Sequence, residues 1–325
     1  MEQERQSIRI GVAMIACALL FRLVGGAADV AVALFSHPKV AEFIIYMETG
    51  RLVRLDAAAP EETVESTQTA TQPQKEPVSF SPQDAELVDM SNFTGYDPDI
   101  EKLLTSPLSW DLTEDAPAVL ILHTHATESY TGTSGYRSTD AGCNMLRVGQ
   151  EIARILEENG VGVIHDTTLH DKPSYNGSYN NARKTIEARL SEYPSIRLVL
   201  DVHRDALELT DSVQLSTYAQ VDGQASAQLM LVMGTNAGGL NHPDWQENLS
   251  VALKLQALLE RNHPGICRPI HLRTERFNQD LSGGGMIVEV GAAGDTLEEA
   301  LVAARAFAES IVALSSGAVT ADSTS

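Results

Sequence analysis

The chain has little cysteine. Its three cysteines, Cys17, Cys143 and Cys267, are spread over 325 residues. An odd and sparse count excludes a disulfide framework, although spacing alone leaves a single Cys143–Cys267 bridge open. Nothing in the neighbouring sequence marks an activated thiolate, so the sequence gives no support to cysteine-based catalysis.

Positive charge is also scarce. The chain has 23 Lys and Arg residues against 44 Asp and Glu residues, and its formal net charge is −21. An acidic chain without a basic stripe is a poor binder of nucleic acid. Eleven acidic residues and one lysine lie between Asp56 and Glu101. This composition, with few large apolar residues at its start, predicts an acidic flexible linker over residues 56–114.

Long apolar runs are confined to the N-terminus. The run Ile10–Phe21 is followed by Arg22, and the next run contains Asp29, whereas a membrane-spanning helix needs about 20 apolar residues. No Ala-x-Ala-like cleavage site follows. We interpret residues 1–35 as an uncleaved, single-pass membrane anchor with the rest of the chain on the extracytoplasmic side. The alternative is a buried amphipathic helix of a soluble domain. Residues 36–55 are expected to form a juxtamembrane amphipathic helix.

After the linker, apolar strands alternate with amphipathic helices. This alternation predicts an α/β domain over residues 115–314, with a mixed, mainly parallel sheet and helices on both faces. Residues 315–325 are expected to be a disordered tail. The expected strands are Val119–Leu122, Val161–His165, Ile196–Val202 and Met286–Val290; a hairpin turns at Asp222-Gly223; and the expected helices are Asn144–Glu158, Tyr179–Ser191, Asp244–Asn262 and Thr296–Leu314.

Three of these strands end at, or contain near their ends, residues whose side chains can bind a metal or take part in catalysis. Val119–Leu122 is followed by His123, His125 and Glu128. Imidazole nitrogens and a carboxylate oxygen are ligands that zinc prefers, and α/β folds place their sites where strands end. Because His123 and His125 are two residues apart, we expect them to share one face of the strand.

The other two strands follow the same pattern. Ile196–Val202 is followed by His203, and Glu289 interrupts the apolar strand Met286–Val290. A buried carboxylate needs a cation, a donor or water beside it. Each residue alone could be a satisfied core histidine or a strand-edge charge, but three such strands in one domain favour a common site.

These motifs resemble those of the stage II sporulation protein P family, which consists of membrane-anchored peptidoglycan hydrolases. The resemblance runs from about residue 115 to the end of the last helix. It includes the segments His123–Tyr130, Asn144-Met145, Val148-Gly149, His165-Asp166, Ser174-Tyr175, Ser178-Tyr179, Arg183, Asp201–Asp205, Val232–Thr235, His242–Trp245, Glu247-Asn248, Arg268–Ile270, Asn278-Gln279, Val288–Gly291 and Thr296–Glu299.

The resemblance implies a fold similar to that of zinc-dependent N-acetylmuramoyl-L-alanine amidases. It implies cleavage of the amide between N-acetylmuramic acid and L-alanine in peptidoglycan, a second activity on peptide cross-links, and a role in forespore engulfment during sporulation. The implied partner is a lytic transglycosylase similar to stage II sporulation protein D, within a membrane complex.

Amidases of this kind bind zinc through two histidines and a glutamate and use a second glutamate as catalyst. On this pattern the zinc ligands are His123 or His125, then Glu128 and His203, and Glu289 is the general base and acid. Many such amidases carry the ligand glutamate near the first helix. This chain has only Asp140 close to that position, and Glu128 is therefore the better candidate.

Further residues are candidates for contacts with substrate. Arg204 could stabilise an oxyanion or clamp a carboxylate, or form a structural ion pair. Tyr175, Tyr179, Arg183 and Asp205 are expected to shape the substrate groove, although tyrosines spaced by four often serve packing. The competing functions are a metallocarboxypeptidase of the cell wall and an anchored peptidoglycan-binding protein without catalysis.

Overall fold

The structure is a computed structural model that describes residues 78–108, 112, 116–210, 213–315 and 318–320. The chain divides into two compact units, Met1–Thr67 and Gln68–Ser325, and all described residues belong to the second. The expected anchor, the juxtamembrane helix and the linker up to residue 77 lie outside the described residues. Within the described ranges, no helix is long and apolar enough to span a membrane.

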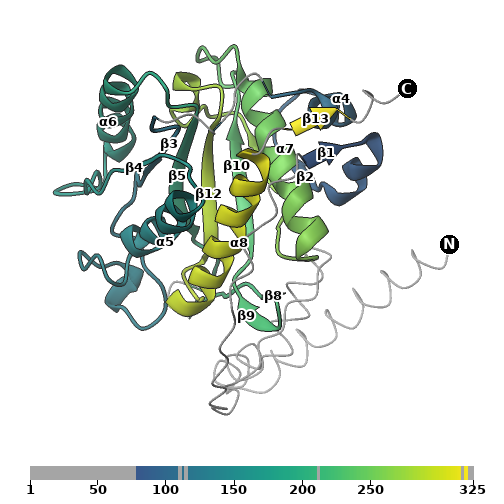
Figure 1. Cartoon of the computed structure of the whole chain (residues 1–325). Coiled ribbons are helices and arrows are strands. Elements are labelled where there is room, and N and C mark those ends of the chain that lie inside the picture. The colour runs from purple at the N-terminus through teal and green to yellow at the C-terminus, as the bar shows by residue number, and fades with distance from the viewer. Residues whose placement is uncertain (1–77, 109–111, 113–115, 211–212, 316–317, 321–325) are drawn as a thin grey trace, which may run out of the picture. The chain divides into compact units, whose positions relative to one another are not determined.

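Helices and strands alternate along most of the second unit (Figure 1). In chain order the elements are β1 (Val78–Phe80), η1 (Pro82–Leu87), β2 (Met90–Asn92), α4 (Ile100–Thr105), β3 (Val119–Leu122), η2 (Ser134–Tyr136), α5 (Met145–Glu158), β4 (Val163–His165), α6 (Ser178–Glu192), β5 (Leu198–Asp205), β6 (Glu208–Thr210), β7 (Val213–Gln214), β8 (Ala219–Val221), β9 (Gln224–Ser226), β10 (Leu229–Gly234), α7 (Trp245–Asn262), β11 (Ile270–Arg273), η3 (Gln279–Leu281), β12 (Gly285–Ala292), α8 (Leu297–Ser315) and β13 (Ala318–Thr320).

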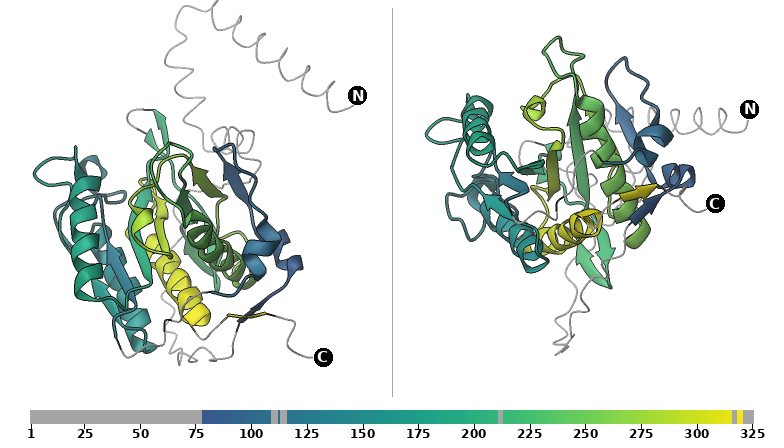
Figure 2. Two further views of the ribbon diagram at one scale, coloured as in Figure 1. Left: turned by 90° about the horizontal axis from the view of Figure 1, so that it is seen from above. Right: turned by 45° about the horizontal axis from the view of Figure 1, so that its top comes forward.

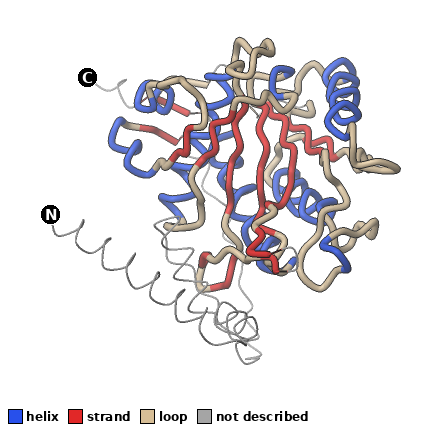
Figure 3. Tube along the Cα trace, turned by 180° about the vertical axis from the view of Figure 1, so that it is seen from behind, coloured by secondary structure: helices blue, strands red, loops and turns tan. Residues whose placement is uncertain are grey.

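A seven-stranded sheet forms the centre of this unit, in the order β2-β11-β10-β12-β5-β3-β4 (Figure 3). Within that sheet, β10 and β12 are antiparallel and the other neighbouring strands are parallel. The predicted mixed, mainly parallel sheet is therefore confirmed. The helix predicted to begin at Asn144 is capped by the side chain of that residue, which accepts a hydrogen bond from the backbone of Leu146.

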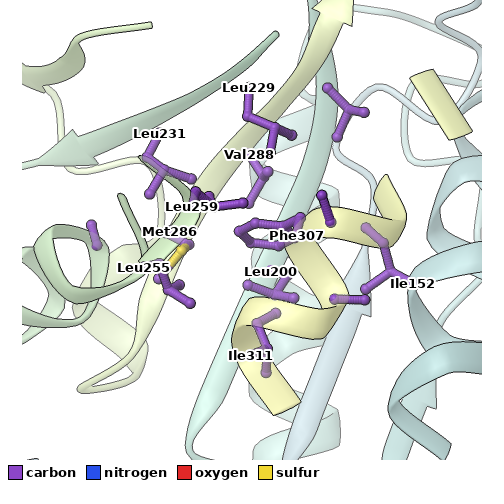
Figure 4. Close-up of a cluster of buried hydrophobic side chains, with 14 of the residues drawn as sticks. Ile152, Leu200, Leu229, Leu231, Leu255, Leu259, Met286, Val288, Phe307 and Ile311 are labelled. Atoms are coloured by element: carbon purple, nitrogen blue, oxygen red, sulfur yellow. The ribbon is translucent and has the colours of Figure 1, made fainter. Parts of the chain in front are cut away.

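Helices cover both faces of the sheet, as the alternation of side chains requires. On β3, Val119 and Ile121 join the main core, while Leu120 and Leu122 join a second cluster with α6. Helix α8 lies between α5 and α7 on the main-core face (Figure 2). Its Phe307 and the sheet residues around it pack in the centre of that core (Figure 4). A sheet buried on both faces needs apolar residues at successive positions of its strands.

The structure differs from the sequence prediction over residues 78–108. These residues were expected to be linker, yet β2 is the edge strand of the sheet and α4 packs against α7. Leu104 is fully buried, and the Lys254 ammonium donates to the Leu103 carbonyl oxygen at 2.8 Å. The acidic composition indicated a linker, although the segment forms short elements whose few apolar side chains pack against the rest of the unit. The linker prediction therefore extended too far towards the C-terminus.

Two smaller points concern the predicted hairpin and the disulfide that the sequence left open. The hairpin at Asp222-Gly223 forms, but it comprises only β8 and β9, because β10 leaves it to pair with β11 and β12 in the central sheet. No disulfide joins Cys143 and Cys267.

Candidate active site

The ends of three parallel strands bring the predicted site residues to one edge of the sheet. Strands β3, β5 and β12 run in the same direction, so their carboxyl ends meet at one edge. In register, Glu289 of β12 lies opposite His203 of β5, and Leu122 of β3 lies opposite Asp201. Residues that are far apart in the sequence thereby become neighbours.

The alternation of the strands also places these side chains on one face. On β5, Leu200 and Val202 point into the main core, so Asp201 and His203 point to the opposite face. On β12, Val288 and Val290 belong to the main core, and Glu289 lies on the same opposite face as His203.

Carboxylates surround the imidazole of His203. Its Nε2 lies 2.9 Å from Asp201 Oδ1, and its Nδ1 lies 3.4 Å from Glu128 Oε2. Neither His203 Nε2 nor Glu128 Oε2 has a partner in hydrogen-bond geometry. Burial alone would lower the pKa of His203, but the charges of Asp201 and Glu128 raise it well above the usual value. The site therefore strongly favours a cation at this position.

Asp201 is fixed by Thr124. The backbone N–H of Thr124 donates to Asp201 Oδ1 at 2.7 Å, and its hydroxyl donates to Oδ2 at 2.6 Å. Although burial raises the pKa of Asp201, the His203 charge and these hydrogen bonds lower it to about 2. Asp201 is thus an ionised carboxylate held against His203, an arrangement typical of the residue behind a metal-binding histidine.

Glu289 has the opposite electrostatic character. Its Oε2 is buried without a hydrogen-bond partner. Burial raises the pKa of Glu289 to about 8, an effect that the charge of His203 partly opposes. A carboxyl group whose pKa lies near neutrality is suited to accepting and returning a proton.

The loop after β3 carries His125 and Glu128 to the same place. The ring of His125 lies nearly perpendicular to that of His203, with centroids 5.4 Å apart, and stacks on Tyr175 at 4.2 Å. Burial and the neighbouring His203 lower the pKa of His125 to about 4, so it stays neutral, as a metal ligand must. The Glu128 carboxylate also lies 3.6 Å from Arg137.

His123 occupies a different environment. Its Nδ1 contacts the Val202 carbonyl oxygen at 2.9 Å, and its Nε2 contacts His165 Nε2 at 2.9 Å. A Cβ atom at Gly149 of α5 would lie 2.5 Å from the His123 ring, so the glycine makes room for this pair. Burial, followed by the His165 charge, lowers the pKa of His123 to about 3.

The expectation that His123 and His125 share one face is therefore wrong. Strand β3 ends at Leu122, and the alternation rule applies only to extended chain. Both ring nitrogens of His123 are engaged on the α5 side of the sheet, while His125 turns towards His203.

The structure places the other predicted residues in several environments. The Arg204 guanidinium donates to the carbonyl oxygens of Ser129 at 3.0 Å and Tyr136 at 2.9 Å, so it braces the loop after β3. Arg183 forms a bidentate pair with Asp280, and Asp205 accepts from Arg268 at 2.6 Å. Arg204, Arg183 and Asp205 are thus each engaged by other parts of the chain in this structure.

Both predicted tyrosines lie beside His125. The Tyr175 ring stacks on it, and the Tyr179 ring lies edge-on at 5.7 Å. Tyr175 is 52% exposed, which leaves one side of the ring accessible to a ligand.

Sequence reasoning missed the importance of Asp201 and Arg137. Asp201 stands two residues before His203 on an extended strand, so the period of two would have placed both on one face. Arg137 had no such signal, because it reaches the site only through the path of a long loop.

The arrangement can be compared with the needs of a metal ion. Among the described residues, no group of three His, Cys, Asp or Glu side chains is already arranged around a metal position. The donor types of His125, Glu128 and His203 nevertheless suit zinc, and the unpartnered Glu128 Oε2 faces the His203 ring. A buried polar atom without a partner is costly, and a cation beside Glu128 would satisfy its Oε2. The donor types of these residues therefore fit a zinc ion.

Comparison with known proteins agrees with the motifs. The family model described as "Stage II sporulation protein P (SpoIIP)" matches residues 38–312. Stage II sporulation protein P of Bacillus subtilis (strain 168) is 27% identical over 213 residues, which cover 61% of this chain and 51% of that protein. The chain thus spans about half the length of this curated relative.

Solved structures of N-acetylmuramoyl-L-alanine amidases are more distantly similar. AmiC2 of Nostoc punctiforme is 13% identical with a TM-score of 0.37, and covers 60% of this chain and 95% of its own. The amidase from Clostridium difficile 630 is 13% identical with a TM-score of 0.39, and covers 61% of this chain and 94% of its own.

Proposed function

Since the chain belongs to the stage II sporulation protein P family, we propose that it is a zinc-dependent peptidoglycan hydrolase. Its substrate would be the amide between N-acetylmuramic acid and L-alanine, cleaved during forespore engulfment. The observation that carries the proposal is the convergence of His125, Glu128 and His203 beside Glu289, a buried carboxyl group with a pKa of about 8.

Three residues would hold the zinc ion in this proposal: His125, Glu128 and His203. The bound ion would polarise the scissile carbonyl and lower the pKa of a coordinated water. Asp201 would orient His203, because its carboxylate is itself fixed by Thr124. His123 would serve as a buried support behind this loop, since both of its ring nitrogens already have partners.

Glu289 would carry the proton transfers. Its carboxyl group, whose pKa burial raises to about 8, would in its ionised form accept a proton from water. The same group would then donate that proton to the leaving nitrogen of the cleaved amide. Arg204 would act indirectly, by holding the loop that carries Glu128.

The wider setting follows from the family. We propose that the protein acts on the extracytoplasmic side of the membrane, together with a lytic transglycosylase similar to stage II sporulation protein D, and that cleavage of peptide cross-links is a second activity. Residues 1–35 would provide the attachment to the membrane.

We expect the full chain to fractionate with membranes, and we expect external protease to cut it between residues 57 and 77. Recovery of the intact chain in the soluble fraction would contradict this.

A digest of purified cell wall tests the proposed reaction. The full chain with zinc is expected to release free stem peptides whose N-terminal residue is L-alanine, identified by mass. Single D-alanine residues as the main product would indicate a carboxypeptidase instead. Wall that binds the protein but remains unchanged would indicate a binding protein. The Glu289→Gln variant provides the matched inactive control.

A further inference from the structure

A polar groove opens beside the proposed catalytic residues. Its volume is about 330 Å³, and it is lined by Thr127, Arg137, Asp171, Lys172, Pro173 and Tyr175. Two of these residues connect it directly to the site. Tyr175 stacks on His125 at 4.2 Å, and Arg137 lies 3.6 Å from Glu128. A ligand in this groove would therefore extend from the position where the bond is cleaved.

The Arg137 guanidinium is well placed to bind an anion. Its side chain is 38% exposed. Its contacts with the Thr127 hydroxyl, Asp171 and Glu128 are long, at 3.3, 3.4 and 3.6 Å. A guanidinium has five N–H donors in a planar fork, so several remain for a ligand. Its carbon Cζ also lies 4.8 Å from the centroid of the Tyr175 ring, which limits where the fork can point.

Lys172 adds a second cation to the groove. Lys172 is exposed, and within the described part of the chain its ammonium forms no hydrogen bond or ion pair. The lining also contains the buried Asp171 carboxylate: its Oδ2 accepts from both the backbone N–H and the hydroxyl of Thr127, and its Oδ1 has no hydrogen-bond partner. In a chain with a net charge of −21, two accessible cations in one groove form a local site for an anion.

The backbone that carries Arg137 is fixed. Arg204 donates to the Tyr136 carbonyl oxygen at 2.9 Å, and the backbone bridge between Glu128 and Arg137 joins the two sides of the loop. Arg137 is therefore held at a defined distance from Glu128, as a residue that sets substrate position must be.

We propose that this groove binds a carboxylate in the peptide half of the substrate, with Arg137 as the main recognition group and Lys172 as a second cation. The inference rests on the proposed function, because it places the peptide, and not the glycan, over this side of the site. A planar fork matches a carboxylate through two parallel hydrogen bonds, whereas a neutral sugar hydroxyl gains little from two cations.

Paired substrates test the inference. One is a muropeptide whose peptide carboxylates are free, and the other is the same compound with those carboxylates converted to carboxamides. The wild-type holoenzyme is expected to prefer the free carboxylates by about tenfold or more in kcat/KM. In Arg137→Gln this preference should fall to near unity through a higher KM for the charged substrate. Because the readout is the ratio of the two kcat/KM values, a general loss of activity through the neighbouring Glu128 affects both substrates and cancels.

Two further variants separate recognition from general damage. Lys172→Gln, which alters the groove without touching Glu128, should reduce the preference partially. Arg154→Gln removes an arginine whose partners, Glu151 and Glu158, belong to its own helix α5, and it should leave the preference unchanged. Equal losses on both substrates in Arg137→Gln, or no preference in the wild type, would overturn the inference. If the wild type hydrolyses neither substrate nor cell wall, the proposed function itself fails.

Discussion

Glu289→Gln is expected to lower the turnover of cell-wall amide hydrolysis by at least about 10²-fold, the share that a general base usually contributes. The substitution keeps the size and shape of the side chain but removes the group that accepts the proton. Bound zinc should remain at the wild-type level, because Glu289 lies on the neighbouring strand, outside the proposed ligand set. Turnover and zinc content measured on the same preparation check the result. A zinc-poor variant would mean that Glu289 is a ligand.

The same variant should show the energetic cost of Glu289 in metal-free protein. Burial raises the pKa of this group from 4.5 to about 8. Below pH 4.5 the carboxyl group is protonated in both the folded and the unfolded state, so it does not reduce the free energy of unfolding. Between pH 4.5 and 8 the unfolded chain releases the proton first, so the wild type loses stability as pH rises. Glu289→Gln lacks this loss and should be more stable than the wild type above pH 8, by at least about 1 kcal/mol. Urea unfolding of metal-free protein at pH 4.5 and pH 8.5 measures the difference. An equal difference at both pH values would contradict an elevated pKa.

His203→Ala is expected to abolish both zinc binding and hydrolysis. The wild-type chain should hold about one equivalent of zinc, as expected for a single site with three protein ligands. In the variant, Glu128 and Asp201 would lose the imidazole between them, and the remaining ligands cannot complete the site. Elemental analysis after gel filtration provides the measurement. Full zinc occupancy with retained activity would exclude His203 as a ligand.

The two histidines after β3 provide an internal comparison for the same experiment. His125→Ala should be as poor in zinc as His203→Ala, because its ring faces the site. His123→Ala should keep most of its zinc, because that ring bonds to Val202 and His165 instead. Loss of zinc only in His123→Ala would reverse the assignment. Full zinc in both variants would remove the whole loop from the metal site.

The sequence by itself determined the elements that carry the site. Apolar runs such as Val119–Leu122 fixed the strands, because side chains buried on both faces of a sheet must be apolar at successive positions. The positions of His203 and Glu289 relative to those runs are enough to identify them as candidate site residues. Such patterns can be recognised in the sequence because each pattern depends only on residues that are close together along the chain.

Residues 78–108 show where local patterns fail. Their acidity indicated a linker, yet β2 and α4 are held by packing against the sheet and α7. Stability that comes from residues far away in the sequence leaves no periodic signal in a segment only about three to six residues long.

Tertiary structure alone decided how the site is assembled. The different surroundings of His123 and His125 depend on the end of β3 at Leu122 and on the room that Gly149 of α5 leaves for the His123 ring. The role of Arg204 as a loop brace, and the approach of Arg137 to Glu128, depend on the path of the chain between β3 and α5. Strand alternation predicts direction only while the chain is extended; beyond the last strand residue, the contacts of the loop decide which side chain reaches the site.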